Sequence, residues 1–179
     1  MSRTNPLKKK RRAASRTLLM YGEGFEDETF LKYLKRLYSR DSGVGVTIRN
    51  GKGGHPADVV INAANQPGEF SQRIVILDND ASEADMNLAR QEAKKRNITL
   101  LENTPCLEAL LLAILNDGKS YADKQSAWCK KEFESNHLDS KKRTEIREYE
   151  KIFPQTLLNT VRPKIPGLNE IILLMEGKG

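Results

Sequence analysis

The sequence predicts an α/β fold, in which a mainly parallel four-stranded sheet carries helices on both faces and a helical extension follows it. Residues 16–116 alternate four times between a short apolar run and a helical pattern, as doubly wound sheets do. The run 73–77 (RIVIL) is apolar at every position, which is typical of a strand buried on both faces of a parallel sheet. After Gly118 the alternation stops, and charged segments with helical propensity follow.

Each predicted strand is a short apolar run that ends at glycine or polar residues favouring a turn. The four predicted strands are 17–21, 44–48, 73–77 and 97–101. Between 26 and 40 the apolar residues fall on one face at helical spacing, which predicts the first helix. Pro56 suits the first turn of the second helix. The predicted helices of this region are 26–40, 56–64, 82–96 and 107–115.

The chain is expected to have three parts. Its 179 residues suit one domain of ordinary size with a small appendage. Residues 1–15 lack apolar periodicity and are predicted to be a disordered basic tail. Residues 16–116 form the predicted sheet domain. Residues 117–179 form a predicted helical extension that packs on the sheet domain and ends in a short amphipathic helix, 168–175.

The positive charge is concentrated at the N-terminus. Residues 1–20 hold seven lysines and arginines and no acid, whereas the whole chain has a net charge of +6, so the remainder is close to neutral. A compact cationic run condenses onto a polyanion and releases counterions, which predicts contact with nucleic acid. The alternative is a solvated tail that only aids solubility. The candidate nucleic-acid-binding residues of the tail are Lys8, Lys9, Lys10, Arg11 and Arg12.

Composition disfavours several other classes of protein. No run approaches the roughly 18 apolar residues that a membrane span needs. The basic N-terminus is not followed by an apolar segment of signal-peptide length. We therefore expect a cytoplasmic protein without membrane contact. Cys106 and Cys129 lie far apart, which indicates neither a disulfide framework nor a zinc site.

Acidic residues follow two of the predicted strands. Glu23 lies two residues past the first strand, and Asp78 and Asp80 come directly after the third. In open α/β sheets, ligands bind outside the carboxyl ends of the strands. If the two strands are neighbours, the three carboxylates converge, and a hard cation such as Mg²⁺ or Mn²⁺ would relieve their repulsion. The alternatives are an exposed turn residue for Glu23 and a helix N-cap for Asp78.

Three segments carry a resemblance to a known family. Residues 23–34 (EGFEDETFLKYL) resemble the E-G-x-x-[DE]-x-x-[FY]-L-x-x-L start of Toprim domains, and residues 77–80 (LDND) are similar to the Toprim D-x-D motif. Residues 104–112 (TPCLEALLL) are similar to the N-P-C-F-E-x-W-L-L segment of RloB-like proteins. The chain therefore resembles the RloB-like and OLD-type Toprim proteins over residues 8–116. It departs from them at Leu107 and Ala109, where they carry bulkier aromatics.

The resemblance implies a Toprim-like, Rossmann-like domain and a Mg²⁺- or Mn²⁺-dependent nuclease acting on DNA or RNA in bacterial phage defence. Glu23, Asp78 and Asp80 match the catalytic metal-binding acids, and Asp27 matches an acid that helps to hold a second metal. Glu108 matches a further acid of the family. The alternative for Glu108 is an acid that the dipole of a helix N-terminus favours.

The loop after the second predicted strand is a candidate phosphate contact, and the sequence also bears on possible partner proteins. Lys52 stands beside Gly53, where its side chain and nearby backbone amides can contact a phosphate. The chain lacks a GxxxxGK[ST] motif, so any ATPase partner is expected to be a separate chain. A non-catalytic Toprim-fold module, which binds nucleic acid or serves as a sensor beside such an ATPase, is the alternative function. Self-association is left open.

Overall fold

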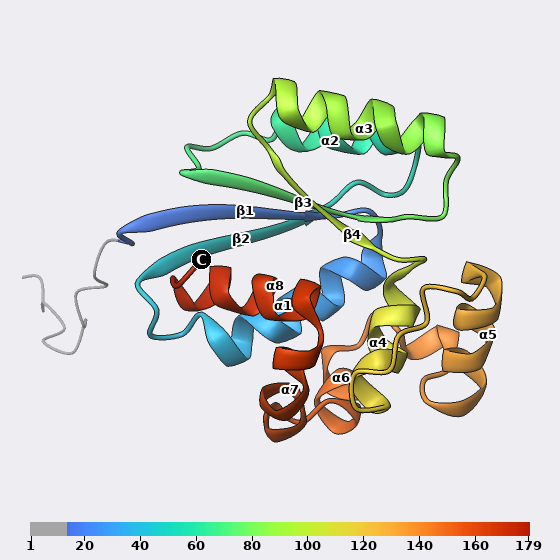
Figure 1. Cartoon of the computed structure of the whole chain (residues 1–179). Coiled ribbons are helices and arrows are strands. Elements are labelled where there is room, and N and C mark those ends of the chain that lie inside the picture. The colour runs from blue at the N-terminus through green and yellow to red at the C-terminus, as the bar shows by residue number, and fades with distance from the viewer. Residues whose placement is uncertain (1–13) are drawn as a thin grey trace, which may run out of the picture.

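The structure is a computed structural model that describes residues 14–179, and it contains one sheet of four strands (Figure 1). The strand order is β2-β1-β3-β4, and all three neighbouring pairs are parallel. The predicted α/β class is confirmed, and the sheet is entirely rather than mainly parallel. The strands are β1 Arg16–Gly22, β2 Val44–Asn50, β3 Gln72–Asp78 and β4 Thr99–Asn103.

Helices cover both faces of the sheet, as predicted. One face packs against α2 and α3 through a compact apolar layer that includes Leu19, Val75 and Val59. The other face packs against α1, α4 and α8 through a larger layer that includes Met20 and Ile74. Figure 1 shows the two layers above and below the strands. The helices named here are α1 Phe25–Tyr38, α2 Pro56–Ala64, α3 Glu83–Lys95, α4 Leu107–Leu115 and α8 Pro166–Glu176.

The strand order reverses between β1 and β3. The chain leaves β1 through α1 to reach β2 on one side, and leaves β3 through α3 to reach β4 on the other side. Two connections that run apart from neighbouring strands open a crevice at the carboxyl ends of those strands. This topological switch point is where the residues after β1 and at the end of β3 meet.

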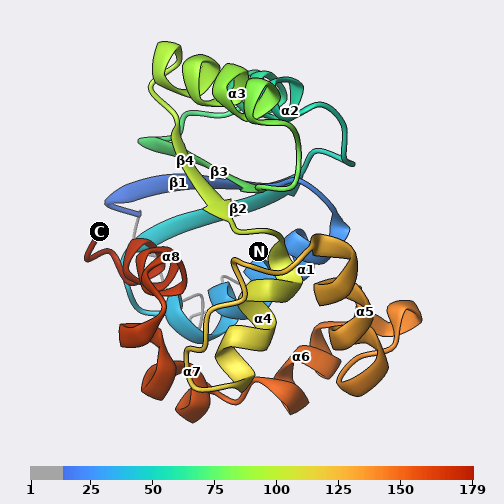
Figure 2. The same ribbon diagram turned by 45° about the vertical axis from the view of Figure 1, so that its right-hand side comes forward.

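Residues 117–179 form more helices than the sequence predicts. The helix α7 lies between Pro154 and Pro163, where prolines suggested only interruptions. The last helix, α8, returns to the sheet, and Leu168 and Ile172 are buried against it. In Figure 2 the remaining helices gather around α4 and the start of α1. These elements are α5 Ser126–Asn136, η1 Ser140–Lys142, α6 Ile146–Ile152, α7 Gln155–Val161 and η2 Arg162–Lys164.

Element boundaries differ from the predictions where a turn residue or a strand partner decides them. The last strand begins at Thr99 instead of residue 97, because Asn97 adopts the left-handed conformation (φ 54°) in the turn that closes α3. The second strand continues to Asn50, which pairs with Gly22 of β1.

Among residues 14–179, no helix combines the length and apolar character needed to cross a bilayer.

Candidate functional site

Two of the predicted site residues meet at the switch point. Strands β1 and β3 are neighbours, and Gly22 pairs with Ile76, so the residues that follow each strand lie side by side. Glu23 Oε2 accepts a hydrogen bond of 3.2 Å from the backbone N–H of Asp78. Glu23 and Asp78 therefore lie close together because their strands are neighbours in the sheet.

A cavity of about 270 Å³ lies beside this contact, and acids dominate its charged lining. Its carboxylates come from the turn after β1, the first turn of α1, the end of β3 and the first turn of α4. One cation, Lys130 of α5, lines it as well. The five acids are Glu23, Glu26, Asp27, Asp78 and Glu108. The sheet domain and the extension therefore build the cavity together.

Asp27 lies in the first turn of α1 and is 7 % exposed. Its Oδ2 accepts a hydrogen bond of 3.0 Å from the N–H of Gly24, whereas its Oδ1 is buried without a hydrogen-bond partner. Burial raises the pKa of Asp27 to about 7, with a further contribution from the charges of Glu23 and Glu108. A buried carboxylate oxygen without a partner is costly, and such atoms commonly mark a site that a ligand completes.

Asp78 is the last residue of β3, and its side chain faces the start of α4. Its Oδ1 accepts a hydrogen bond of 2.8 Å from the N–H of Leu107, the first residue of that helix. A helix N-terminus favours an anion there. Burial nevertheless raises the pKa of Asp78 to about 8, and the neighbouring charges of Asp27 and Glu23 add to the effect.

Glu108 lies in the first turn of α4 and is 3 % exposed. Its Oε1 accepts a hydrogen bond of 2.9 Å from Nη1 of Arg143, whereas its Oε2 is buried without a partner. The same guanidinium nitrogen lies 2.9 Å from Oε2 of Glu26. One carboxylate oxygen of Glu108 is therefore hydrogen-bonded to an arginine of the extension, and the other has no hydrogen-bond partner.

Asp80 stands apart from the cavity. It is exposed and is not among the lining residues, and its Oδ2 lies 3.6 Å from Nζ of Lys130. It remains close enough to influence Glu23, whose pKa is raised chiefly by burial and further by the charge of Asp80. Burial disfavours the charge on Lys130, but Glu108, Asp78 and Asp80 outweigh it and raise the pKa of the ammonium group.

The loop after β2 is tied to the turn that holds Glu23. The N–H of Gly53 donates to the carbonyl oxygen of Glu23 at 2.8 Å, and Gly53 lines the acidic cavity. Lys52 adopts a left-handed conformation (φ 59°) and its side chain is exposed. Lys52 therefore lies beside the site without lining it. The tail residues predicted to bind nucleic acid, Lys8 to Arg12, lie outside the described residues.

The carboxylates are not arranged as a complete metal cage. Among residues 14–179, no three His, Cys, Asp or Glu side chains stand together as a ready set of ligands. One oxygen each of Glu23, Asp27 and Asp78 accepts a hydrogen bond from a backbone N–H.

Three residues of the site have no place in the sequence predictions, namely Glu26, Lys130 and Arg143. Glu26 had a signal, since it is an acid in the first turn of the helix that begins after Glu23. Lys130 and Arg143 lie in charged, motif-free segments of the extension. Only the packing of the extension on α1 and α4 brings them to the acids.

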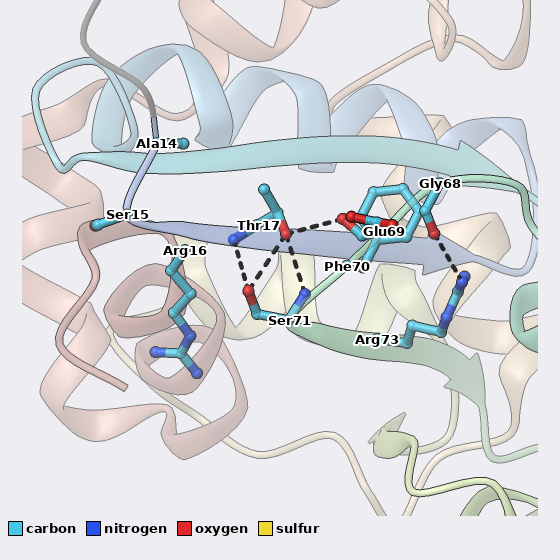
Figure 3. Close-up of a pocket in the computed structure, with 9 residues that line it drawn as sticks. All are labelled: Ala14, Ser15, Arg16, Thr17, Gly68, Glu69, Phe70, Ser71 and Arg73. Carbon is cyan, nitrogen blue, oxygen red and sulfur yellow. Dashed lines mark hydrogen bonds between the residues drawn. The ribbon is translucent and has the colours of Figure 1, made fainter.

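A second cavity, of about 560 Å³, lies at the other end of the strands, where β1 and β3 begin (Figure 3). Its polar groups are largely paired with one another. The hydroxyl of Thr17 donates to the carbonyl of Glu69, and Arg73 donates to the carbonyl of Gly68. The guanidinium of Arg73 also lies 4.9 Å from the centre of the Phe70 ring. These contacts shape a turn, and among the described residues none that lines this cavity has a buried side-chain group without a partner.

Comparison of the chain with protein-family models, with curated proteins and with solved structures found no match.

Proposed function

We propose that this chain is a metal-dependent nuclease of Toprim type, which hydrolyses phosphodiester bonds of DNA or RNA with Mg²⁺ or Mn²⁺. One observation carries the proposal: Asp27 Oδ1 and Glu108 Oε2 are buried carboxylate oxygens without a partner, and both residues line the acidic cavity. A divalent cation is the partner that such hard oxygen atoms accept most readily. The chemistry of these donor atoms therefore supports a metal ion as the ligand of the cavity.

The proposed ligands are Asp27, Asp78 and Glu108, and Glu23 completes the set or exchanges a proton. A bound divalent ion would polarise the scissile phosphate and neutralise the charge that develops on it. Glu23 is partly exposed and has a raised pKa, which suits a group that accepts a proton from the attacking water. Lys130 stays charged at the cavity and would pair with a phosphate oxygen.

The sequence resemblance supplies the biological setting of the proposal. RloB-like and related Toprim proteins belong to phage-defence modules, often beside an ATPase, and we extend that role and a separate ATPase partner to this chain as part of the proposal. Asp80 was predicted as a catalytic metal ligand, but it does not line the cavity. Asp80 would act by holding Lys130 rather than as a ligand of the ion.

A non-catalytic module that binds nucleic acid is the second candidate, and a specific observation favours it. Glu23 Oε2 and Asp78 Oδ1 already accept backbone hydrogen bonds, and the described residues contain no ready metal cage. These acids would then serve to join β1, β3 and α4. In that case metal binding and cleavage would both be absent.

Cleavage assays with matched variants separate the two candidates. The protein is incubated with plasmid DNA, single-stranded DNA and RNA in Mg²⁺, Mn²⁺ or EDTA. The nuclease proposal expects metal-dependent cleavage that Asp78→Asn abolishes and Asp41→Asn preserves, since Asp41 is an exposed acid before β2, at the opposite edge of the sheet. Absence of cleavage on every substrate, with no Mg²⁺ or Mn²⁺ bound in calorimetry, would refute it in favour of the binding module.

A further inference from the structure

Arg143 is a buried arginine of the helical extension that reaches two acids of the site. It lies between η1 and α6 and is 7 % exposed. Its Nη1 lies 2.9 Å from Glu26 Oε2 and 2.9 Å from Glu108 Oε1. Its Nη2 lies 3.6 Å from Glu134 Oε2. A single guanidinium therefore holds two of the five acids of the cavity.

This pairing divides the acids into two groups. Glu26 and Glu108 share a cation that stays charged at any ordinary pH, because a guanidinium does not deprotonate in proteins. Glu23, Asp27 and Asp78 have no lysine, arginine or histidine nitrogen within 4.0 Å, as far as residues 14–179 are concerned. The second group has only the more distant charge of Lys130 beside it, whereas the first is in direct contact with a cation.

The burial of Arg143 argues against a purely stabilising contact. Glu108 is buried with it, whereas Glu26 is partly exposed. Taking a guanidinium and a carboxylate out of water is costly, and buried pairs often bring little net stability. The arginine does not line the cavity but stands behind the two acids that do. It therefore fixes the side chain of Glu108 by one oxygen and leaves Oε2 as the only uncommitted oxygen of that carboxylate.

We propose that Arg143 takes the place of a second metal ion, so that the site binds one divalent cation. Glu26 and one oxygen of Glu108 would otherwise be the ligands left over for a second ion, and the guanidinium occupies both. Arg143 is thus a positioning residue that acts through Glu108. The inference rests on the proposed function, but it concerns the number of ions rather than the existence of the site.

The test is the stoichiometry of Mg²⁺ and Mn²⁺ measured on the whole chain by calorimetry and by the electron paramagnetic resonance of free Mn²⁺. The wild-type protein is expected to bind one ion per chain. Two ions overturn this inference while leaving the proposed function intact. Binding of no ion overturns both.

Variants test the part that Arg143 plays. Arg143→Met releases Glu26 and Glu108 and is expected to raise the stoichiometry to two, whereas Arg36→Met, at an exposed ion pair with Glu150, leaves it at one. A folded Arg143→Met protein that binds one ion or none overturns the inference. If that variant does not fold, Glu26→Gln decides. Stoichiometry of one with affinity within about threefold of wild type supports the inference, and a loss of tenfold or more makes Glu26 a ligand and overturns it.

Discussion

If Asp27 and Asp78 bind Mg²⁺ as we propose, protons and the ion compete for these two carboxylates, and the affinity for Mg²⁺ depends on pH. Burial raises the pKa of Asp27 to about 7 and that of Asp78 to about 8, so both are largely protonated at pH 6. A metal ligand must lose its proton before it binds. Between pH 6 and pH 9 the penalty falls about tenfold at Asp27 and about a hundredfold at Asp78. We therefore expect Mg²⁺ affinity to rise about a thousandfold, which corresponds to about 4 kcal/mol.

Calorimetry in buffers of different ionisation enthalpy measures both the affinity and the protons released. Near pH 6 the release should approach about two protons per ion, and it should fall towards zero at pH 9. Asp41→Asn is the control and should show the same profile. Asp27→Asn removes one of the two titrating ligands and also one of the charges that raise the pKa of Asp78, so the affinity should rise by less than about a hundredfold over the same range. An affinity that is constant from pH 6 to 9, with no proton release, would refute the assignment of these two aspartates as ligands.

Four further predictions follow from the described contacts. Asp27 and Asp78 have raised pKa values, so without metal the folded state binds more protons than the unfolded state between about pH 4 and 8. The free energy of unfolding, measured by urea titration, should therefore fall as pH rises through this range. Lys130→Met should reduce the salt dependence of single-stranded DNA binding by a slope of about 0.7, and Lys95→Met, on α3, should not, as fluorescence titration will show. Gly22→Ala should destabilise the protein by about 1–3 kcal/mol in urea titration, because the added Cβ would lie 2.5 Å from Cβ of Asp27. Burial raises the pKa of the Cys106 thiol, so a disulfide reagent should label it at pH 8 only after denaturant is added.

The sheet could be predicted from the sequence because its signals are local. The run 73–77 is apolar at every position and became the core of β3, and the glycines after Tyr21 ended β1 as expected. The helical extension was harder because its burial depends on distant partners. Ile146, Tyr149 and Phe153 fall at helical spacing and predict an apolar face. The spacing does not reveal what covers that face, which for Phe153 includes Phe30 and Phe133.

The sequence could predict those acids of the site whose positions depend only on where strands end and a helix begins. The placement of Glu23 and Asp78 follows from where the strands end, and Asp27 follows from the spacing in α1. The position of Asp80 outside the cavity does not follow, because it depends on how the chain turns after β3. Arg143 was beyond reach, since a single arginine in a charged segment has no pattern that distinguishes it from its solvated neighbours.

The entry of Arg143 and α8 into the core also has a consequence for synthesis of the protein on the ribosome. Tyr33 on α1 donates a hydrogen bond to the carbonyl of Phe153, which is 120 residues later, and α8 packs on α1 and β2. Contacts between such distant residues form slowly, and a nascent chain cannot form them until both partners have emerged. A growing chain that has completed all four strands would still hold Glu108 without its arginine. The acids can therefore reach the arrangement described here only after Arg143 and α8 have emerged from the ribosome.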